Sequence, residues 1–341
     1  MNAFIVSGGG SKGAFAVGVA KYIREQRPAI KFDICGGTST GALVAPLVAI
    51  GEHAELEAVY TNTTTDQIIT KGNVLSRFLE EPSLFDATPL WALINKTWTQ
   101  ARYDRLMASP TIVYVATVCL QTGEIVYWSN KAMPAPGSII VHQVATRMEW
   151  LSAVLASACQ PVFMQPIAIR STPAAPRQYC DGGMREYLPI ELALDLGASD
   201  VFAVALSPAT DPGMPGKTFK SVFDILQTTI NWFSEDVALT DVRVPELIGR
   251  GVNRIADAKR RLLQGGVAQA VIDACFIEPP DDPFAGRTVR NIHALRPDAP
   301  LGGGPGGLTF DPLEMQAMLG AGFRVAERYF GPAVPTIPPI V

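Results

Sequence analysis

The sequence predicts an α/β fold built on a mostly parallel central sheet. A short apolar strand, a glycine-rich loop and a helix follow one another near the N-terminus, and the same plan is repeated directly afterwards. Parallel strands need crossover connections, which are usually helical, so this alternation is typical of a parallel sheet. The chain has 341 residues, of which 48% are hydrophobic and 18% charged, so it can bury a large core.

Composition narrows the function classes. The net charge of −4 argues against nucleic-acid binding, and no block of Lys/Arg marks a polybasic membrane patch. No paired Cys-x-x-Cys motif is present, and the five cysteines are widely spread, which favours reduced, mostly buried thiols over disulfides or a zinc site. We therefore expect no metal and no cofactor. The cysteines are Cys35, Cys119, Cys159, Cys180 and Cys275.

The N-terminal segment has no basic region and no long apolar region, so it does not predict a secretory signal peptide. No apolar run reaches the ~18 residues that a membrane-spanning helix needs. We expect a soluble, cytoplasmic protein, or one exported by a route that needs no signal peptide.

The first structural unit is a strand at residues 3–6, a loop at 7–13 and a helix at 14–23. Its loop contains Gly8-x-Gly10-x-x-Gly13, the pattern of a dinucleotide-binding loop, and Asp33 follows about 20 residues later, where such folds place a ribose-binding acid. Asp33, however, stands near the start of the next strand and not at its far end. Tight packing of the helix on the sheet is a further explanation for the glycines.

The second unit is a strand at residues 32–35 followed by Gly37-Thr38-Ser39-Thr40-Gly41 and an apolar helix. This is the Gly-x-Ser-x-Gly pattern of a nucleophile elbow, in which a serine occupies a sharp turn between strand and helix. The segment Gly9-Gly10-Ser11-Lys12-Gly13 matches the same pattern. From the pattern alone, either serine is a candidate nucleophile.

Residues 52–108 are predicted to be a mainly helical insertion or cap, with its clearest helices at 54–60 and 89–98. A hairpin of two strands is expected next, because two β-rich runs flank a Gln-Thr-Gly turn. The further elements predicted before residue 210 are a helix at 151–159, short strands at 167–169 and 178–180, a helix at 189–196 and a strand at 200–206; the hairpin strands are 111–118 and 124–128.

Residues 219–264 predict two long amphipathic helices separated near Pro245. Their apolar stripe is interpreted as a core face in preference to a membrane face. A Pro- and Gly-rich region follows, with a strand at 291–295 and a loop at 302–307, and a last amphipathic helix covers 313–330. The chain is interpreted as one domain over residues 1–331 with a tail at 332–341. The stripe consists of Val222, Phe223, Leu226, Ile230, Phe233 and Val237.

The two glycine-rich loops together suggest acyl-transfer chemistry. Parallel strands end at the same edge of the sheet, so both loops are expected at one edge. Successive glycines expose backbone N–H groups at a helix N-terminus, where the helix dipole favours negative charge. Such donors stabilise the oxyanion that forms when a serine attacks an ester carbonyl.

A nucleophilic serine needs a base. The three histidines, His53, His142 and His293, lack a neighbouring turn signature and are interpreted as ordinary surface or core residues. The alternative is Asp181, in the chain's single Asp-Gly pair, directly after a predicted strand. An ordinary Asp-Gly turn explains this pair equally well.

With these motifs in order, the chain resembles the patatin-like phospholipase family of bacterial type. The resemblance covers residues 3–50 and 156–206, is weaker near the C-terminus and is absent from 52–108 and 210–290. One position departs from the pattern, because Tyr187 stands where the family often has Asn. The segments that match family motifs are 8–13, 37–41, 181–183 and 156–166, with weaker matches at 309–311 and Gly322.

The resemblance implies a three-layer α/β/α, patatin-like fold and hydrolysis of phospholipid or lysophospholipid esters, with peripheral membrane contact and no nucleic acid. It implies a Ser–Asp dyad, with Ser39 as nucleophile and Asp181 as general base. It also places Ser11 in the oxyanion loop. The implied oxyanion hole is Gly8, Gly9, Gly10 and Ser11, and the supporting motif residues are Lys12, Gly13, Gly37, Gly41, Gly182 and Gly183. A nucleotide-binding α/β protein, or a patatin fold that is latent without a partner, are the alternatives.

Overall fold

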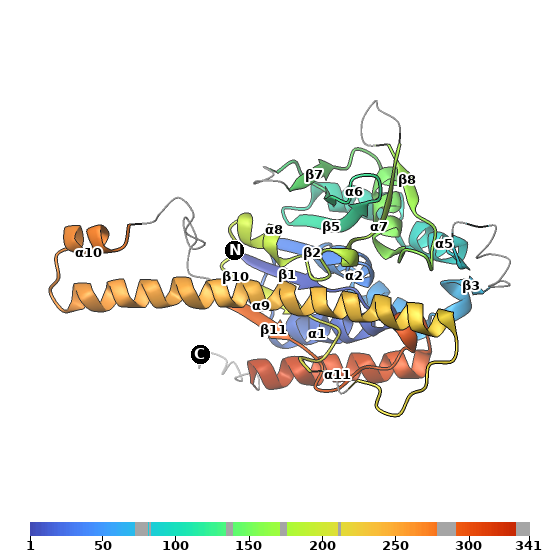
Figure 1. The fold of residues 1–341 in the computed structure, drawn as a ribbon. Helices are drawn as coiled ribbons and strands as arrows, with labels where there is room; N and C mark the ends of the chain where they lie inside the picture. Colours follow the sequence, from blue (N-terminus) through green and yellow to red (C-terminus); the bar gives the residue numbers. More distant parts are fainter. Residues whose placement is uncertain are drawn as a thin grey trace, which may run out of the picture.

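The computed structural model describes residues 1–71, 81, 83–133, 139–170, 176–210, 213–277 and 291–331. A mostly parallel sheet crosses the molecule in the order β11-β10-β1-β2-β5-β6-β7, with β9 on β5 and β8 on β9 (Figure 1). Its strands are β1 (Asn2–Val6), β2 (Ile34–Thr38), β5 (Ile112–Cys119), β6 (Ile125–Ser129), β7 (Ile140–Gln143), β8 (Ile167–Ile169), β9 (Arg177–Asp181), β10 (Asp200–Val204) and β11 (Asn291–Leu295).

Helices cover both faces of the sheet, which confirms the three-layer α/β/α prediction. Alternate residues of β1 point to opposite faces: Phe4 and Val6 pack with α1, α2 and α11, whereas Ala3 and Ile5 pack with α8. The helices are α1 (Gly13–Gln26), α2 (Thr40–Ala49), α3 (His53–Asn62), α5 (Thr88–Thr97), α6 (Gln100–Ala108), α7 (Arg147–Ala158), α8 (Ile190–Asp195), α9 (Val222–Gln264), α10 (Gln269–Cys275) and α11 (Pro312–Phe330).

Strand β2 extends further than the sequence indicates, because it continues through two glycines to Thr38. Glycine is a poor strand former, which is why the prediction stopped at Cys35. Here the missing side chain is needed: a Cβ on Gly36 would lie 2.3 Å from the Tyr114 ring of the neighbouring strand. The aromatic ring occupies the space above the glycine.

The edge of β5 that faces β2 pairs with two strands in succession. Thr38, the last residue of β2, pairs with Ala116, and Asp181, the last residue of β9, pairs with Thr117. The antiparallel strand β9 thus takes over where the parallel strand β2 ends. This register brings the residue after Thr38 next to Asp181.

The segment from 52 to 108 contains α3, α5, α6 and a two-stranded sheet of β3 (Thr70–Lys71) and β4 (Phe85–Asp86). The predicted hairpin is present as the antiparallel pair β5–β6, and the expected strand at 291–295 is β11. The prediction of two helices separated at Pro245 is wrong, because α9 runs through it as one 43-residue helix. Proline lacks one N–H donor, and the surrounding hydrogen bonds hold the helix together.

Other expectations concern single residues or the chain ends. Cys35, Cys119, Cys159 and Cys180 are buried, and Cys275 is exposed. Within the described ranges, no helix is both long and apolar enough to cross a membrane. Residues 332–341, the expected tail, lie outside the described residues.

Candidate active site

Ser39 occupies a sharp turn between β2 and α2. Its backbone has φ 56°, in the left-handed region that residues with a side chain rarely adopt. The turn is tight because a Cβ on Gly41 would lie 2.1 Å from the Val6 carbonyl oxygen, and one on Gly37 would lie 2.2 Å from the Gly41 carbonyl oxygen. Both glycines of the motif are therefore required by close backbone contacts, as a nucleophile elbow demands.

Asp181 ends β9 and is buried, with 7% of its surface exposed. Its Oδ1 accepts a hydrogen bond from the Gly183 N–H at 2.8 Å, and the Ser39 side chain lies beside the carboxylate. Burial raises the pKa of Asp181 to about 6, and the neighbouring Ser39 side chain and Gly183 N–H oppose the shift. A carboxylate with such a pKa is a stronger base than an exposed aspartate and is still ionised at neutral pH.

The C-terminal end of α7 holds both residues in place. The Ser157 hydroxyl donates to the Ala116 carbonyl oxygen at 2.7 Å and accepts from the Ser39 N–H at 3.0 Å. Two residues later, the Cys159 carbonyl oxygen accepts from the Asp181 N–H at 2.9 Å. The sequence motif at 156–166 was a family resemblance without an assigned role, and here it connects the two candidate residues to strand β5.

The first glycine-rich loop lies beside Ser39, and its glycines make different contacts. Gly9 and Gly10 line the cavity above Ser39 and have φ 146° and 58°. The Gly8 N–H donates to the Tyr187 carbonyl oxygen at 3.2 Å, so this donor is already engaged. Of the predicted oxyanion donors, the cavity therefore brings Gly9 and Gly10 to Ser39, and Gly8 instead joins the loop to Tyr187.

The other residues of this loop are Ser11, Lys12 and Gly13, and of these only Lys12 lines the cavity. Ser11 is fully buried and does not line the cavity, and its hydroxyl has no hydrogen-bond partner among the described residues. A Cβ on Gly13 would lie 2.5 Å from Thr40 Oγ1, and one on Gly10 would lie 2.3 Å from the Gly307 carbonyl oxygen. The segment 302–307, predicted as an unspecific loop, packs against the glycine loop.

A cavity of about 720 Å³ opens above Ser39 and Asp181, and its wall is mostly apolar. Residues from α2, α3, α5 and the loop after α7 form one side, and the N-terminal half of α9 forms the other. Apart from the site residues, the charged groups that line it are Lys12, Glu235 and Asp236. The apolar lining includes Leu43, Ile68, Leu90, Leu93, Met164, Leu226, Ile230, Val237 and Leu308.

Only part of the stripe on α9 is a core face, as predicted: among its members, Ile230 packs against the hydrophobic core. Leu226, Ile230 and Val237 are half-buried and line the cavity, whereas Val222 is 83% exposed and Phe233 68% exposed. Amphipathic spacing indicates an apolar face but does not distinguish a packed core from the wall of a binding cavity. No motif in 210–290 marked this wall in the sequence.

Tyr187 lies between the two loops. Its ring lines the cavity, and a Cβ on Gly8 would lie 2.8 Å from this ring and 3.1 Å from the Ser39 Cβ. Burial and the nearby Asp181 raise the pKa of the phenol, so it stays neutral. The aromatic residue at the family's Asn position fills space between the glycine loop and the Asp-Gly turn.

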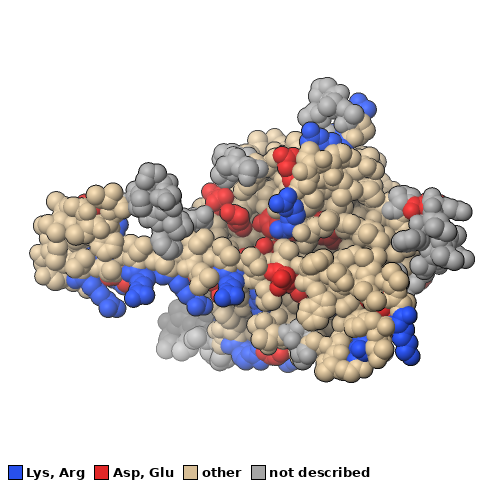
Figure 2. All heavy atoms as spheres, viewed as in Figure 1, with Lys and Arg blue, Asp and Glu red and all other residues tan. Residues whose placement is uncertain are grey.

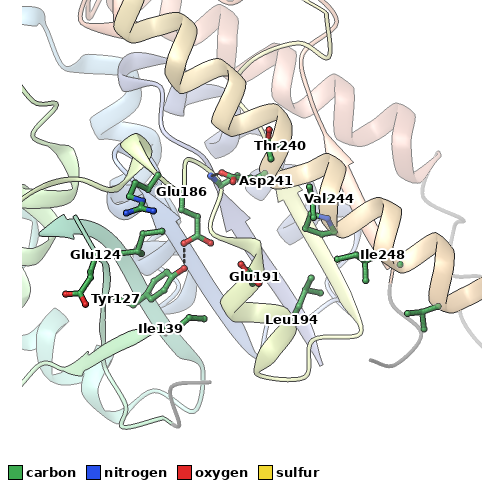
Figure 3. Close-up of a pocket in the computed structure, with 16 residues that line it drawn as sticks. Glu124, Tyr127, Ile139, Glu186, Glu191, Leu194, Thr240, Asp241, Val244 and Ile248 are labelled. Atoms are coloured by element: carbon green, nitrogen blue, oxygen red, sulfur yellow. Dashed lines mark hydrogen bonds between the residues drawn. The ribbon is translucent and has the colours of Figure 1, made fainter. Parts of the chain in front are cut away.

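Behind this loop, a second cavity of about 470 Å³ lies between α9, α8 and β6 (Figure 3). Asp241 of α9 accepts hydrogen bonds from the Tyr187 and Leu188 N–H groups at 2.7 and 2.9 Å. Glu186 points toward Tyr127, whose hydroxyl is hydrogen-bonded to it. Burial raises the pKa of Glu186 to about 8 and that of Asp241 to about 7. The segment after Asp181 is thereby attached to α9.

None of the three histidines lines the cavity above Ser39. His142 packs on Trp128, His293 is hydrogen-bonded to Tyr329 and Asp200, and His53 lies at the start of α3. Asp33 precedes β2 and accepts from the Asn2 N–H at 2.8 Å, at the opposite edge of the sheet from the glycine loops. Among the described residues, neither a histidine nor Asp33 therefore lies beside Ser39 and the glycine loops.

One family model matches the part of the chain that holds these motifs. The model of the family described as "Patatin-like phospholipase" matches residues 4–194, which is more than half of the chain. This match includes both glycine-rich loops, α7 and the Asp-Gly turn.

Individual relatives are more distant. The chain is 32% identical over 103 residues to "Uncharacterized protein L620" of Acanthamoeba polyphaga mimivirus, covering 28% of each chain. Among solved structures, VipD from Legionella pneumophila superposes with a TM-score of 0.45 and 12% identity, covering 96% of this chain and 66% of VipD. The chain thus spans under a third of the first relative and about two thirds of the second.

Proposed function

The chain belongs to the patatin-like phospholipase family, a family of lipid acyl hydrolases, and from this we propose that it is a serine hydrolase using a Ser39–Asp181 dyad. The observation that carries the proposal is the adjacency of these two side chains, beside Gly9 and Gly10 and beneath an apolar cavity. Nucleophile, base and oxyanion donors within reach of one space are the parts that acyl transfer requires.

In the first half-reaction, the Ser39 hydroxyl attacks the ester carbonyl carbon and its proton moves to the Asp181 carboxylate. The carbonyl oxygen becomes an oxyanion, which accepts hydrogen bonds from the Gly9 and Gly10 N–H groups. Each such donor contributes about 3 kcal/mol to the transition state. Collapse of the tetrahedral intermediate breaks the ester C–O bond, and the leaving alcohol takes the proton from Asp181. Ser39 is then acylated.

In the second half-reaction, Asp181 removes a proton from water, and the hydroxide attacks the acyl-enzyme carbonyl. The same two N–H groups receive the second oxyanion. Collapse breaks the bond to Ser39 Oγ, which regains the proton from Asp181, and the carboxylic acid leaves. A base with a pKa of about 6 suits this cycle, because it is ionised at pH 7 and yet accepts a proton readily.

The cavity indicates the substrate class. Its apolar wall suits an acyl chain, and its size is in the range of small-molecule sites. Lys12 is positioned to meet an anionic group of the substrate, such as a lipid phosphate. We propose phospholipids or lysophospholipids as substrates, reached at a membrane surface by peripheral contact, and a cytoplasmic site of action.

The proposal is tested by hydrolysis of a short-chain nitrophenyl ester and by mass spectrometry of products from a mixed phospholipid and lysophospholipid panel. Ser39→Ala and Asp181→Asn are each expected to lose at least about 1,000-fold in kcat/KM. Ser11→Ala is the matched control and keeps most of the activity, because its buried hydroxyl does not line the cavity.

The opposite pattern, with loss in Ser11→Ala and survival of Ser39→Ala, contradicts the assignment. A fluorophosphonate probe adds a second readout. Labelling at Ser39 supports a competent nucleophile in the isolated chain, whereas its absence together with a folded protein indicates latency without a partner. A rise in melting temperature with NAD or ATP favours the nucleotide-binding alternative.

A further inference from the structure

The C-terminal part of α9 projects beyond the body of the protein and has α10 at its tip (Figure 1). Residues 243–264 contain six basic and two acidic residues, in a chain whose net charge is −4. Figure 2 shows Lys and Arg side chains in a row along one edge of this projection. The basic residues are Arg243, Arg250, Arg254, Lys259, Arg260 and Arg261.

Four of these arginines share one flank of the helix. Arg243, Arg250, Arg254 and Arg261 follow one another at intervals of 7, 4 and 7 residues, and all are exposed. At about 100° per residue, such intervals keep the side chains within an arc of about 60°. Arg243, Arg254 and Arg261 form no ion pair with any described residue; the ion pairs found on this segment are Arg250 with Glu246 and Arg260 with Asp257.

The same flank is apolar in the other half of α9. Ile225, Trp232 and Leu239 precede Arg243 at intervals of 7, 7 and 4 residues. They are 52%, 49% and 39% exposed, which is unusual for side chains of this size. Apolar and cationic residues thus follow each other on one side of the helix over about 54 Å. We name this surface, from Ile225 to Arg261, the α9 flank.

The α9 flank borders the mouth of the catalytic cavity. Phe233, next to Trp232, lines the cavity and is 68% exposed. Met184 and Val162, which also line the cavity, are 50% and 41% exposed. The rim of the cavity is therefore apolar and continuous with the apolar half of the flank. Asp236, which is exposed and lies seven residues before Arg243, interrupts the flank with a negative charge, and Glu235 also lines the cavity.

From this continuity we propose that the α9 flank docks the protein on an anionic lipid bilayer. Ile225, Trp232 and Leu239 enter the interface beside the cavity mouth, and the arginines pair with lipid phosphates further along. Tryptophan and leucine favour the boundary between headgroups and acyl chains, and arginine forms bidentate hydrogen bonds to phosphate. A nucleic acid would use the arginines but has no use for the apolar half, so the bilayer is the better match.

This inference rests on the proposed function for the reason to approach lipid, but its test needs no catalysis. Full-length Ser39→Ala protein is sedimented with vesicles of phosphatidylcholine, with and without phosphatidylglycerol. We expect tighter binding to the anionic vesicles, weakened by salt. The triple variant R250Q/R254Q/R261Q should bind them about 100-fold less tightly, because each basic residue contributes about 1 kcal/mol at such a surface and 1.4 kcal/mol is tenfold.

The matched control, R105Q/R324Q/R328Q, removes the same charge from exposed arginines elsewhere and should bind as Ser39→Ala does. Trp232→Ser should weaken binding to both kinds of vesicle. Equal loss in the control and the α9 variant, or unchanged binding in the α9 variant, overturns the proposal. The proposal is also overturned if the protein binds duplex DNA and no vesicle. The two proposals can fail separately. If vesicle binding depends on the α9 flank but the wild-type protein hydrolyses no lipid, the docking surface stands and only the proposed function is contradicted.

Discussion

Ser39 and Asp181 adjoin one another because strand β5 pairs with β2 up to Ala116 and with β9 from Thr117 onward. The two residues are 142 positions apart in the chain, and the register of a third strand places them together. Ser157 and Cys159 then bind the backbone of both residues from α7. The candidate dyad is therefore positioned by strand pairing and by these backbone hydrogen bonds.

The first prediction concerns pH. The proposed mechanism requires Asp181 as a carboxylate, and burial raises its pKa to about 6. We expect kcat/KM for a nitrophenyl ester to fall below pH 6, by about tenfold per pH unit at the low end, and to reach a plateau above pH 7. A pH–rate profile between pH 4.5 and 8 measures this. A profile that stays flat down to pH 4.5 would contradict the role of Asp181 as base.

Ser157→Ala should damage the site without touching substrate. The change leaves the Ser39 N–H and the Ala116 carbonyl oxygen without their hydroxyl partner, at a cost of about 1–3 kcal/mol in stability. Displacement of the elbow should lower kcat by roughly 10- to 100-fold with a smaller change in KM. Ser152→Ala, on the same helix and half-buried, is the control. Equal kcat in the two variants would remove Ser157 from the positioning of Ser39.

Much of this site follows from local sequence. The elbow around Ser39 and the glycine loop have positive φ angles, and the glycines of the Asp-Gly turn have no room for a Cβ, so each of the three has a short signature. The hairpin strands followed from β-rich runs on either side of a turn, and a strand was also expected where β11 lies. Motifs of a few residues can therefore be predicted where contacts within those few residues determine the backbone conformation.

The cavity wall did not follow, because it depends on packing between distant segments. Leu226 and Ile230 have the spacing of a core helix, and only the fold places them opposite Ser39. The arginines of the α9 flank were missed for a related reason. Arg243, Arg250 and Arg254 are separated by 7 and 4 residues, and the run Lys259-Arg260-Arg261 is too short to mark a patch. Continuity of α9 through Pro245 is what brings them into line.

Gly8→Ala tests the contact between the glycine loop and Tyr187. The new Cβ would lie 2.8 Å from the ring and 3.1 Å from the Ser39 Cβ, so one of these groups must move. We expect at least a tenfold loss of kcat/KM. Gly8→Ala/Tyr187→Ala should recover part of it by removing the closer contact. Tyr187→Ala alone is the reference, and a double variant no better than Gly8→Ala would place the damage at Ser39 alone.

Glu186 should make the protein less stable as pH rises. The folded state retains the Glu186 proton up to about pH 8, whereas the unfolded chain releases it near pH 4.5. The folded state thus binds more protons in this window, so the free energy of unfolding falls with increasing pH. Asp241 acts with the same sign up to about pH 7. Melting temperatures at pH 5.5 and 8 should differ less in Glu186→Gln than in wild type, and an equal difference would contradict the buried proton.

The wall of the cavity should set the length of acyl chain that the protein accepts. Ile230 lines the cavity from α9, and Trp at this position would fill part of its 720 Å³. We expect Ile230→Trp to reduce kcat/KM for long-chain nitrophenyl esters by roughly tenfold or more while the shortest ester is hydrolysed nearly as before. Because uniform loss would instead indicate disruption of the dyad, the ratio between chain lengths is the measurement. Ile225→Trp is the matched control, since Ile225 is 52% exposed on the outer flank of the same helix and does not line the cavity. If both variants change the ratio between chain lengths equally, the cavity-facing side of α9 does not select the acyl chain.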